Sequence, residues 1–73
     1  MPSLLDHRPG TTVRLTAPGP EAPGRRRLLE YGFVPGVQVT VIARGATGGL
    51  LVGLGEARVA LDSRTATGLR CER

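Results

Sequence analysis

The sequence predicts a mainly β fold, a small closed barrel of about five short strands with one short helix after the first strand. Segments in which apolar and polar residues alternate, the pattern of a half-buried strand, are separated by turns rich in Gly and Pro. The apolar residues make up 40% of the chain, are mostly Val, Leu and Ala, and suffice for a compact core. A chain of 73 residues buries only about 60% of the surface that its unfolded form exposes, which is too little for two cores. We therefore expect residues 1–73 to form a single domain.

The N-terminal residues predict one helical turn followed by a strand. Ser3–Asp6 has the composition of a helical turn or an ordered arm, and Pro9 stops it because proline disfavours helix at the residue before it. In residues 11–16, Val13 and Leu15 alternate with polar residues. This alternation predicts a strand with one buried face.

A two-turn helix is expected at residues 25–31, after a Pro-rich loop at residues 18–24. Its residues are good helix formers, and Gly32 can end it with a positive φ. Because so short a helix is marginal in isolation, it has to dock on the barrel. Leu28 and Tyr31, three residues apart, are expected to form the docking face.

The strongest strand signal lies at residues 37–44, where alternate valines share one face. In the strand expected at residues 57–61, Ala57, Val59 and Leu61 are expected to face the core. The other expected elements are a hairpin loop at 45–49, a strand at 50–54, a tight turn at 55–56, a helical turn from Asp62 to Thr67 and a last strand at 69–72.

The single cysteine, Cys71, rules out a disulfide within the chain and fits a reducing compartment. Its strand register with Leu69 predicts a small inward-facing side chain. No apolar stretch of signal-peptide length occurs in residues 1–25, and no run approaches the roughly 20 apolar residues of a membrane span. We expect a soluble, cytoplasmic protein with no membrane insertion.

The net charge is +4, carried by ten arginines and no lysine. Such a charge favours acidic protein surfaces, anionic headgroups or phosphates, and speeds association with them. Tyr31 and Phe33 are the only aromatic residues, too few for the stacking surface of a single-strand nucleic-acid binder. Nucleic acid is therefore not the expected partner.

The sequence predicts no enzyme. One histidine, one cysteine and six carboxylates scattered at turns provide no evident acid–base pair or nucleophile. Without lysine, a nucleotide hydrolase's G-x-x-x-x-G-K-[ST] phosphate loop is impossible. His7 is expected to be solvated, because a structural metal site usually needs four ligands. We predict no catalytic residue, no metal ligand and no cofactor.

Residues 27–39 read Arg-Leu-Leu-Glu-Tyr-Gly-Phe-Val-Pro-Gly-Val-Gln-Val. This segment resembles the signature of the FeoA family, a helix ending in Arg-Leu-x-x-x-Gly-hydrophobic-x-Pro-Gly that runs into a strand of alternating valines. The resemblance continues through residues 52–55 and 58–61 and covers nearly the whole chain. The residues of the structural motif are Leu28, Tyr31, Gly32, Phe33, Pro35 and Gly36.

The resemblance implies an SH3-like β-barrel and a role in bacterial ferrous iron uptake. It implies a non-enzymatic accessory protein that binds the cytoplasmic part of the FeoB transporter and modulates its transport or GTPase cycle. The chain would then be cytoplasmic, and peripheral at the inner membrane through its partner. Although transition metal ion binding is associated with the family, the resemblance implies no metal site and no cofactor in this chain.

Arg25, Arg26 and Leu29 are the candidate partner-binding residues. Leu28 and Leu29 point about 100° apart on a helix, so both cannot face the barrel squarely. With Leu28 and Tyr31 docked, Leu29 is expected to be an exposed anchor with the two arginines beside it. Two alternatives remain open: a small basic nucleic-acid-binding barrel, and a stand-alone repressor-type SH3-like domain that binds a regulator.

Overall fold

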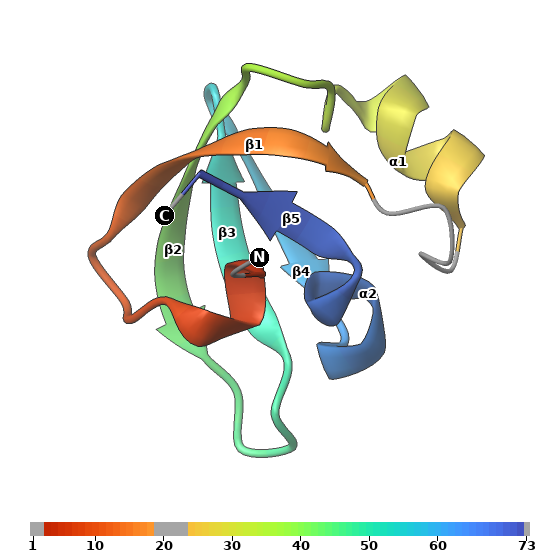
Figure 1. Cartoon of the computed structure of the whole chain (residues 1–73). Coiled ribbons are helices and arrows are strands. Elements are labelled where there is room, and N and C mark those ends of the chain that lie inside the picture. The colour runs from red at the N-terminus through yellow and green to blue at the C-terminus, as the bar shows by residue number, and fades with distance from the viewer. Residues whose placement is uncertain (1–2, 19–23, 73) are drawn as a thin grey trace.

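The computed structural model describes residues 3–18 and 24–72. The predicted Pro-rich loop, including Pro20 and Pro23, therefore lies largely outside the described residues. Within them the chain forms five strands, two short α-helices and one 3-10 turn (Figure 1). In chain order these are η1 (Leu4–Asp6), β1 (Thr12–Pro18), α1 (Arg25–Tyr31), β2 (Gln38–Arg44), β3 (Leu50–Leu54), β4 (Ala57–Leu61), α2 (Ser63–Thr67) and β5 (Leu69–Cys71). The prediction of a mainly β fold with a short helix after the first strand is confirmed.

The strands form one antiparallel sheet in the order β4-β3-β2-β1-β5. The first half of β1 pairs with β2, with Val13 opposite Val39, and the second half pairs with β5, with Leu15 opposite Cys71. A shift of register after Leu15 marks an irregularity of the kind that bends a strand. In Figure 1, β1 accordingly sweeps across the sheet and joins its two halves. β1 extends to Pro18, where a loop was expected, because Pro18 pairs with Leu69.

The hydrophobic core lies inside the curved sheet and is closed by residues from all the helical elements. Phe33 is its largest fully buried side chain. Cys71 is fully buried, as its register with Leu69 predicted. The buried apolar residues are Leu4, Val13, Leu15, Leu28, Phe33, Val39, Val41, Leu50, Val52, Leu61, Ala66, Leu69 and Cys71.

The segment between α1 and β2 is a turn anchored on β1. The backbone N–H of Val37 donates to the carbonyl oxygen of Val34 at 3.1 Å, which places Pro35 and Gly36 at the two central positions of the turn. The N–H of Gly36 donates to the carbonyl oxygen of Leu15 at 2.7 Å. These bonds fix the position of α1 relative to the sheet.

The expectation for the inward face of β4 is only partly correct. Leu61 is buried, but Val59 is half-buried and Ala57 is exposed. β4 is the outermost strand on its side of the sheet, and among the described residues it pairs with β3 alone. Its inner face is therefore incompletely covered by the described residues.

The expectation of a solvated His7 is wrong. The side chain is half-buried, and its Nε2 atom is enclosed without a hydrogen-bond partner among the described residues. The N-terminal turn is held against the end of β2, because Arg44 donates from Nη2 to the carbonyl oxygens of Leu5 and His7, both at 3.0 Å. This long-range contact draws the histidine toward the barrel.

Candidate partner-binding surface

Helix α1 is held on the barrel by residues at and just after its C-terminal end. Leu28 is only 6% exposed, and Phe33, directly after the helix end, is fully buried. Gly32 ends the helix with a φ of +111°, as predicted. The N–H groups of Gly32 and Phe33 donate to the carbonyl oxygens of Leu29 and Leu28, at 3.1 and 3.0 Å. The orientation of α1 is therefore fixed.

The exposures expected for Tyr31 and Leu29 are both wrong. Tyr31 is 61% exposed, whereas Leu29 is half-buried. Gly32 faces β3, since a Cβ added to it would lie 3.4 Å from Cδ2 of Leu54. Successive helical residues are about 100° apart, so this glycine lies about 40° from Leu28, on the side of Leu29. Measured from the direction of Gly32, Leu29 lies about 60° away and Tyr31 about 100° away, so Leu29 turns inward and Tyr31 outward.

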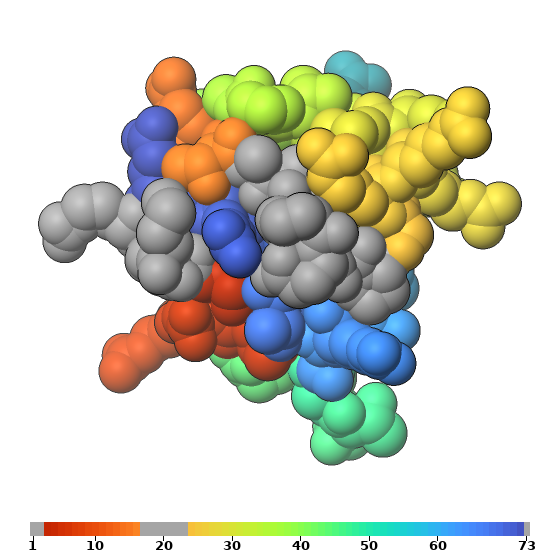
Figure 2. All heavy atoms as spheres, turned by 45° about the vertical axis from the view of Figure 1, so that its right-hand side comes forward, coloured from red at the N-terminus to blue at the C-terminus, as the bar shows by residue number. Residues whose placement is uncertain are grey.

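The three consecutive arginines of α1 are all exposed. Arg26 forms an ion pair with Glu30, four residues later, at 3.9 Å. Their side chains are 95% and 70% exposed, and so open a pair contributes little to stability. Figure 2 shows α1, in orange-yellow and yellow, with its side chains extending from the body of the molecule. The arginines are thus available to an acidic partner.

Tyr31 and Arg27 line two adjacent hollows of the surface. The first, of about 170 Å³, also includes Glu30, and the second, of about 260 Å³, reaches Leu28 and Thr65 of α2. The exposed aromatic ring of Tyr31 therefore lies beside two hollows and the guanidinium-bearing side chain of Arg27. We refer to Arg25, Arg26, Arg27, Leu29 and Tyr31 as the α1 surface.

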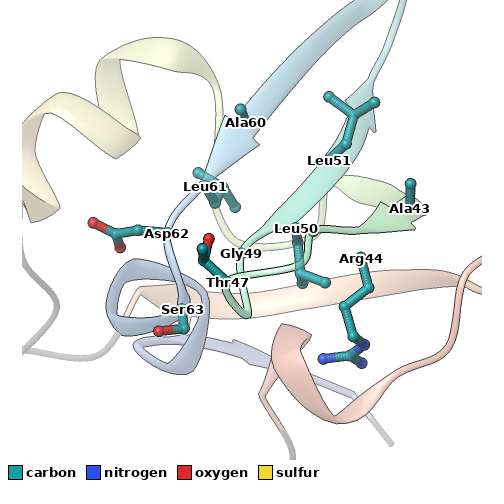
Figure 3. A pocket seen from close by; sticks show the side chains of 11 residues that line it. Ala43, Arg44, Thr47, Gly49, Leu50, Leu51, Ala60, Leu61, Asp62 and Ser63 are labelled. Atoms are coloured by element: carbon teal, nitrogen blue, oxygen red, sulfur yellow. The ribbon is translucent and has the colours of Figure 1, made fainter.

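Two larger hollows lie on the sheet. One, of about 400 Å³, is found where residues 45–49 meet the end of β4 and the start of α2 (Figure 3). Its two charged side chains, Arg44 and Asp62, point in different directions in Figure 3, and Arg44 is engaged with η1. The other, of about 670 Å³, has a lining of mixed polarity and lies over β2, β3 and β4. Neither brings an acid and a base together for catalysis.

The titratable residues that the structure describes offer no ready metal centre. Among residues 3–18 and 24–72, no group of three or more His, Cys, Asp or Glu side chains is placed to hold a metal ion. Burial, with a smaller effect of the Asp6 carboxylate, raises the pKa of Cys71 to about 11. The thiolate that a metal would need is therefore disfavoured at neutral pH.

Fold and surface together define a small SH3-like β-barrel module with an exposed, arginine-rich helix after its first strand. The family model of the FeoA domain matches residues 3–73. The chain belongs to the FeoA family. It is thus one of the small accessory domains associated with ferrous iron transport.

Solved structures agree with this assignment. FeoA of Stenotrophomonas maltophilia in complex with zinc, described as an SH3 domain protein and a proposed activating factor of ferrous iron transport, is 30% identical, with a TM-score of 0.85 over 99% of this chain and 91% of that one. A FeoA-like protein of Clostridium acetobutylicum is 20% identical, with a TM-score of 0.84 over 96% and 83% of the two chains. A manganese-dependent transcriptional repressor is 24% identical, with a TM-score of 0.82 over 93% of this chain and 39% of that one, and shares the fold. A search of curated proteins gave no match.

No helix among the described residues is both long and apolar enough to cross a membrane.

Proposed function

We propose that this chain is a non-enzymatic accessory protein that binds the cytoplasmic part of a FeoB transporter and modulates its transport or GTPase cycle. Family membership supports the link to iron uptake. We choose the α1 surface as the binding site because Tyr31 is exposed on the same short helix as three exposed arginines. The protein would act in the cytoplasm and reach the inner membrane through its partner.

The α1 surface has the composition of a protein-binding site. Tyr and Arg are the residues most enriched among those that dominate binding energy at interfaces. Tyr31 is the anchor in this proposal, and Arg27 lines the same two hollows beside it. Arg25 and Arg26 lie at the start of the helix and would accelerate association with an acidic surface. Nucleotide chemistry belongs to the transporter, because this chain cannot build a lysine-containing phosphate loop.

The experiment measures binding to the purified cytoplasmic domain of FeoB, with and without guanine nucleotide. Tyr31→Glu places a charge where the anchor would enter its pocket. We expect this variant to keep the wild-type melting temperature and to bind at least about tenfold more weakly, a loss typical of an interface anchor. Arg8→Glu is the control, since Arg8 is exposed and lies outside α1.

The arginines are tested through the kinetics. Arg26→Glu is expected to slow association and to reduce its salt dependence, with a smaller effect on dissociation. Arg8→Glu makes the same change of net charge and should alter the association rate less. Normal binding by folded Tyr31→Glu and Arg26→Glu variants would place the interface elsewhere. Tight, sequence-selective binding to RNA or DNA at physiological salt would instead support a nucleic-acid-binding barrel.

A further inference from the structure

The two outer strands of the sheet differ in how their free sides are covered. On one side, β5 is flanked by the N-terminal segment, because Ser3 forms an antiparallel bridge with Arg70. On the other side, β4 pairs with β3 along its whole length, and no second strand among the described residues pairs with it. An uncovered edge presents unpaired N–H and C=O groups to any chain that can pair with it.

The register identifies these groups. Leu54 and Ala57 are partners across the two-residue turn Gly55-Glu56, and the closing pair of such a hairpin exchanges both of its backbone hydrogen bonds. Because hydrogen-bonded pairs alternate along an antiparallel ladder, Arg58 and Ala60 direct their N–H and C=O groups away from β3. No backbone hydrogen bond joins these two residues to a described residue outside β3.

The side chains along β4 leave room for another strand. Ala57, Arg58 and Ala60 are exposed, and Val59 is half-buried. β4 contains no proline, and its pairing with β3 is continuous from Leu50 and Leu61 to Leu54 and Ala57. Of the usual devices that protect an edge strand, β4 has only its shortness and one charge, Arg58. An added strand would cover Val59 on the inner face.

The outer face next to this edge is open and of mixed polarity. Arg58 lies opposite Gly53, which in turn lies opposite Thr40. Since Gly53 has no side chain, Arg58 borders the hollow of about 670 Å³ over β2, β3 and β4. A carboxylate on an added strand would reach the guanidinium of Arg58 from the free side.

We propose that the free edge of β4 is a docking site for an extended acidic segment of a partner protein, which adds to the sheet as a further strand. Backbone hydrogen bonds to Arg58 and Ala60 supply the affinity, and Arg58 selects an acidic residue. The chain's net charge of +4 favours such a segment over a second copy of the same chain. This site is separate from the α1 surface and does not depend on the identity of the transporter.

Backbone amide hydrogen exchange tests the edge directly. In the free protein, the amides of Arg58 and Ala60 should exchange fast, whereas those of Val59 and Leu61 are protected by β3. The probe is a synthetic peptide of alternating Val and Glu, about eight residues long so that it spans β4. It should protect the amides of Arg58 and Ala60, and a matching peptide of Val and Lys should not. Protection of both amides in the free protein, or protection that grows with protein concentration, would overturn the proposal, the latter in favour of a second copy.

Two variants separate the backbone and charge contributions. Ala60→Pro removes an outward N–H without removing a bond to β3, and should weaken peptide binding about tenfold. The control is Ala46→Pro. Ala46 is exposed and is the second residue of a turn in which the N–H of Gly48 donates to the carbonyl oxygen of Gly45. Proline is favoured at this position of a turn. Arg58→Glu should reverse the preference from the Glu peptide to the Lys peptide. Unchanged binding and preference in Arg58→Glu, or wild-type binding by folded Ala60→Pro, would refute the site.

Discussion

Gly49 and Leu61 pass so close to one another that a Cβ added to Gly49 would lie 2.7 Å from the carbonyl oxygen of Leu61. The contact is with backbone, which cannot move aside as the end of a flexible side chain can. Leu61 pairs with Leu50, the residue after Gly49, so the close approach occurs where β3 begins beside the end of β4. A side chain at Gly49 would therefore separate the two strands.

Gly49→Ala is expected to destabilise the protein by roughly 1–3 kcal/mol, the usual cost of forcing an extra carbon into a packed site. Urea unfolding measures the change. Gly45→Ala is the matched control, because its nearest neighbour is the carbonyl oxygen of Gly49 at an ordinary 3.6 Å. Equal unfolding midpoints for the two variants would contradict the close contact.

Gly32→Val should cost about 1 kcal/mol or more, because a β-branched residue is strained at positive φ. The φ of Gly32 is +111°, and the space around its Cβ position is adequate, with Leu54 Cδ2 at 3.4 Å. Backbone strain rather than a clash is thus the cause. Gly32→Asn should cost less, since Asn tolerates left-handed backbone better. If both substitutions leave the urea midpoint unchanged, the helix does not need a glycine at its end.

Cys71 should be unreactive in the folded protein. Burial, and secondarily the Asp6 carboxylate, raises the pKa of the thiol from 9.0 to about 11. Iodoacetamide at pH 8 should therefore label Cys71 in urea but scarcely in native buffer. Rapid labelling of the native protein would show that the C-terminal strand opens readily.

The same pKa shift makes stability depend on alkaline pH. A raised pKa in the folded state means that the contribution of Cys71 is complete below pH 9.0 and is lost as pH rises toward about 11. The slope in this window is at most about 1.4 kcal/mol per pH unit. Cys71→Ala should be less stable at neutral pH, because it leaves a cavity, but should lack this slope. An identical alkaline decline in the variant would assign it to another group.

Asp62 should contribute to stability at neutral pH and lose this contribution in acid. Hydrogen bonding from Thr65, through its side chain and then its backbone N–H, holds the pKa of Asp62 below 3.8, and Arg64 adds to the effect. The N–H of Thr65 lies 2.7 Å from Oδ1 of Asp62, at the start of α2. A lowered pKa gives a contribution that is complete above 3.8 and disappears as pH falls through the folded-state value.

Thermal unfolding of Asp62→Asn tests this dependence. Asn caps a helix about as well as Asp but does not titrate. The variant should match the wild type most closely in acid and should lack the rise in stability that the wild type gains as Asp62 ionises. Parallel curves for the two proteins across the acid range would mean that Asp62 makes no such contribution.

Most elements were predictable because their signals are local. The alternation of valines predicts that Val39 and Val41 of β2 face the core. The strand register with Leu69 predicts the same for Cys71 of β5, and all three side chains are buried. Gly32 could be identified as the end of α1 because its conformation is set by the turn itself. The partner-binding residues were less predictable, because the spacing of three places Leu28 and Tyr31 on one face but does not say how the helix is rotated on the barrel, and in the structure Tyr31 is exposed while Leu29 is half-buried.

The sequence by itself determined the fold class, the order of the elements and the helix end at Gly32 with its positive φ. Period-two alternation and the conformational preferences of Gly and Pro act between near neighbours, so these features can be read without the tertiary structure. Tertiary structure alone decided the rotation of α1, which exposes Tyr31 rather than Leu29, and the enclosure of His7. It also decided that Ala57 stays exposed on β4, an edge strand that no further strand of the described residues covers. In each case the outcome depends on which distant segment meets the side chain, and only the assembled barrel specifies that contact.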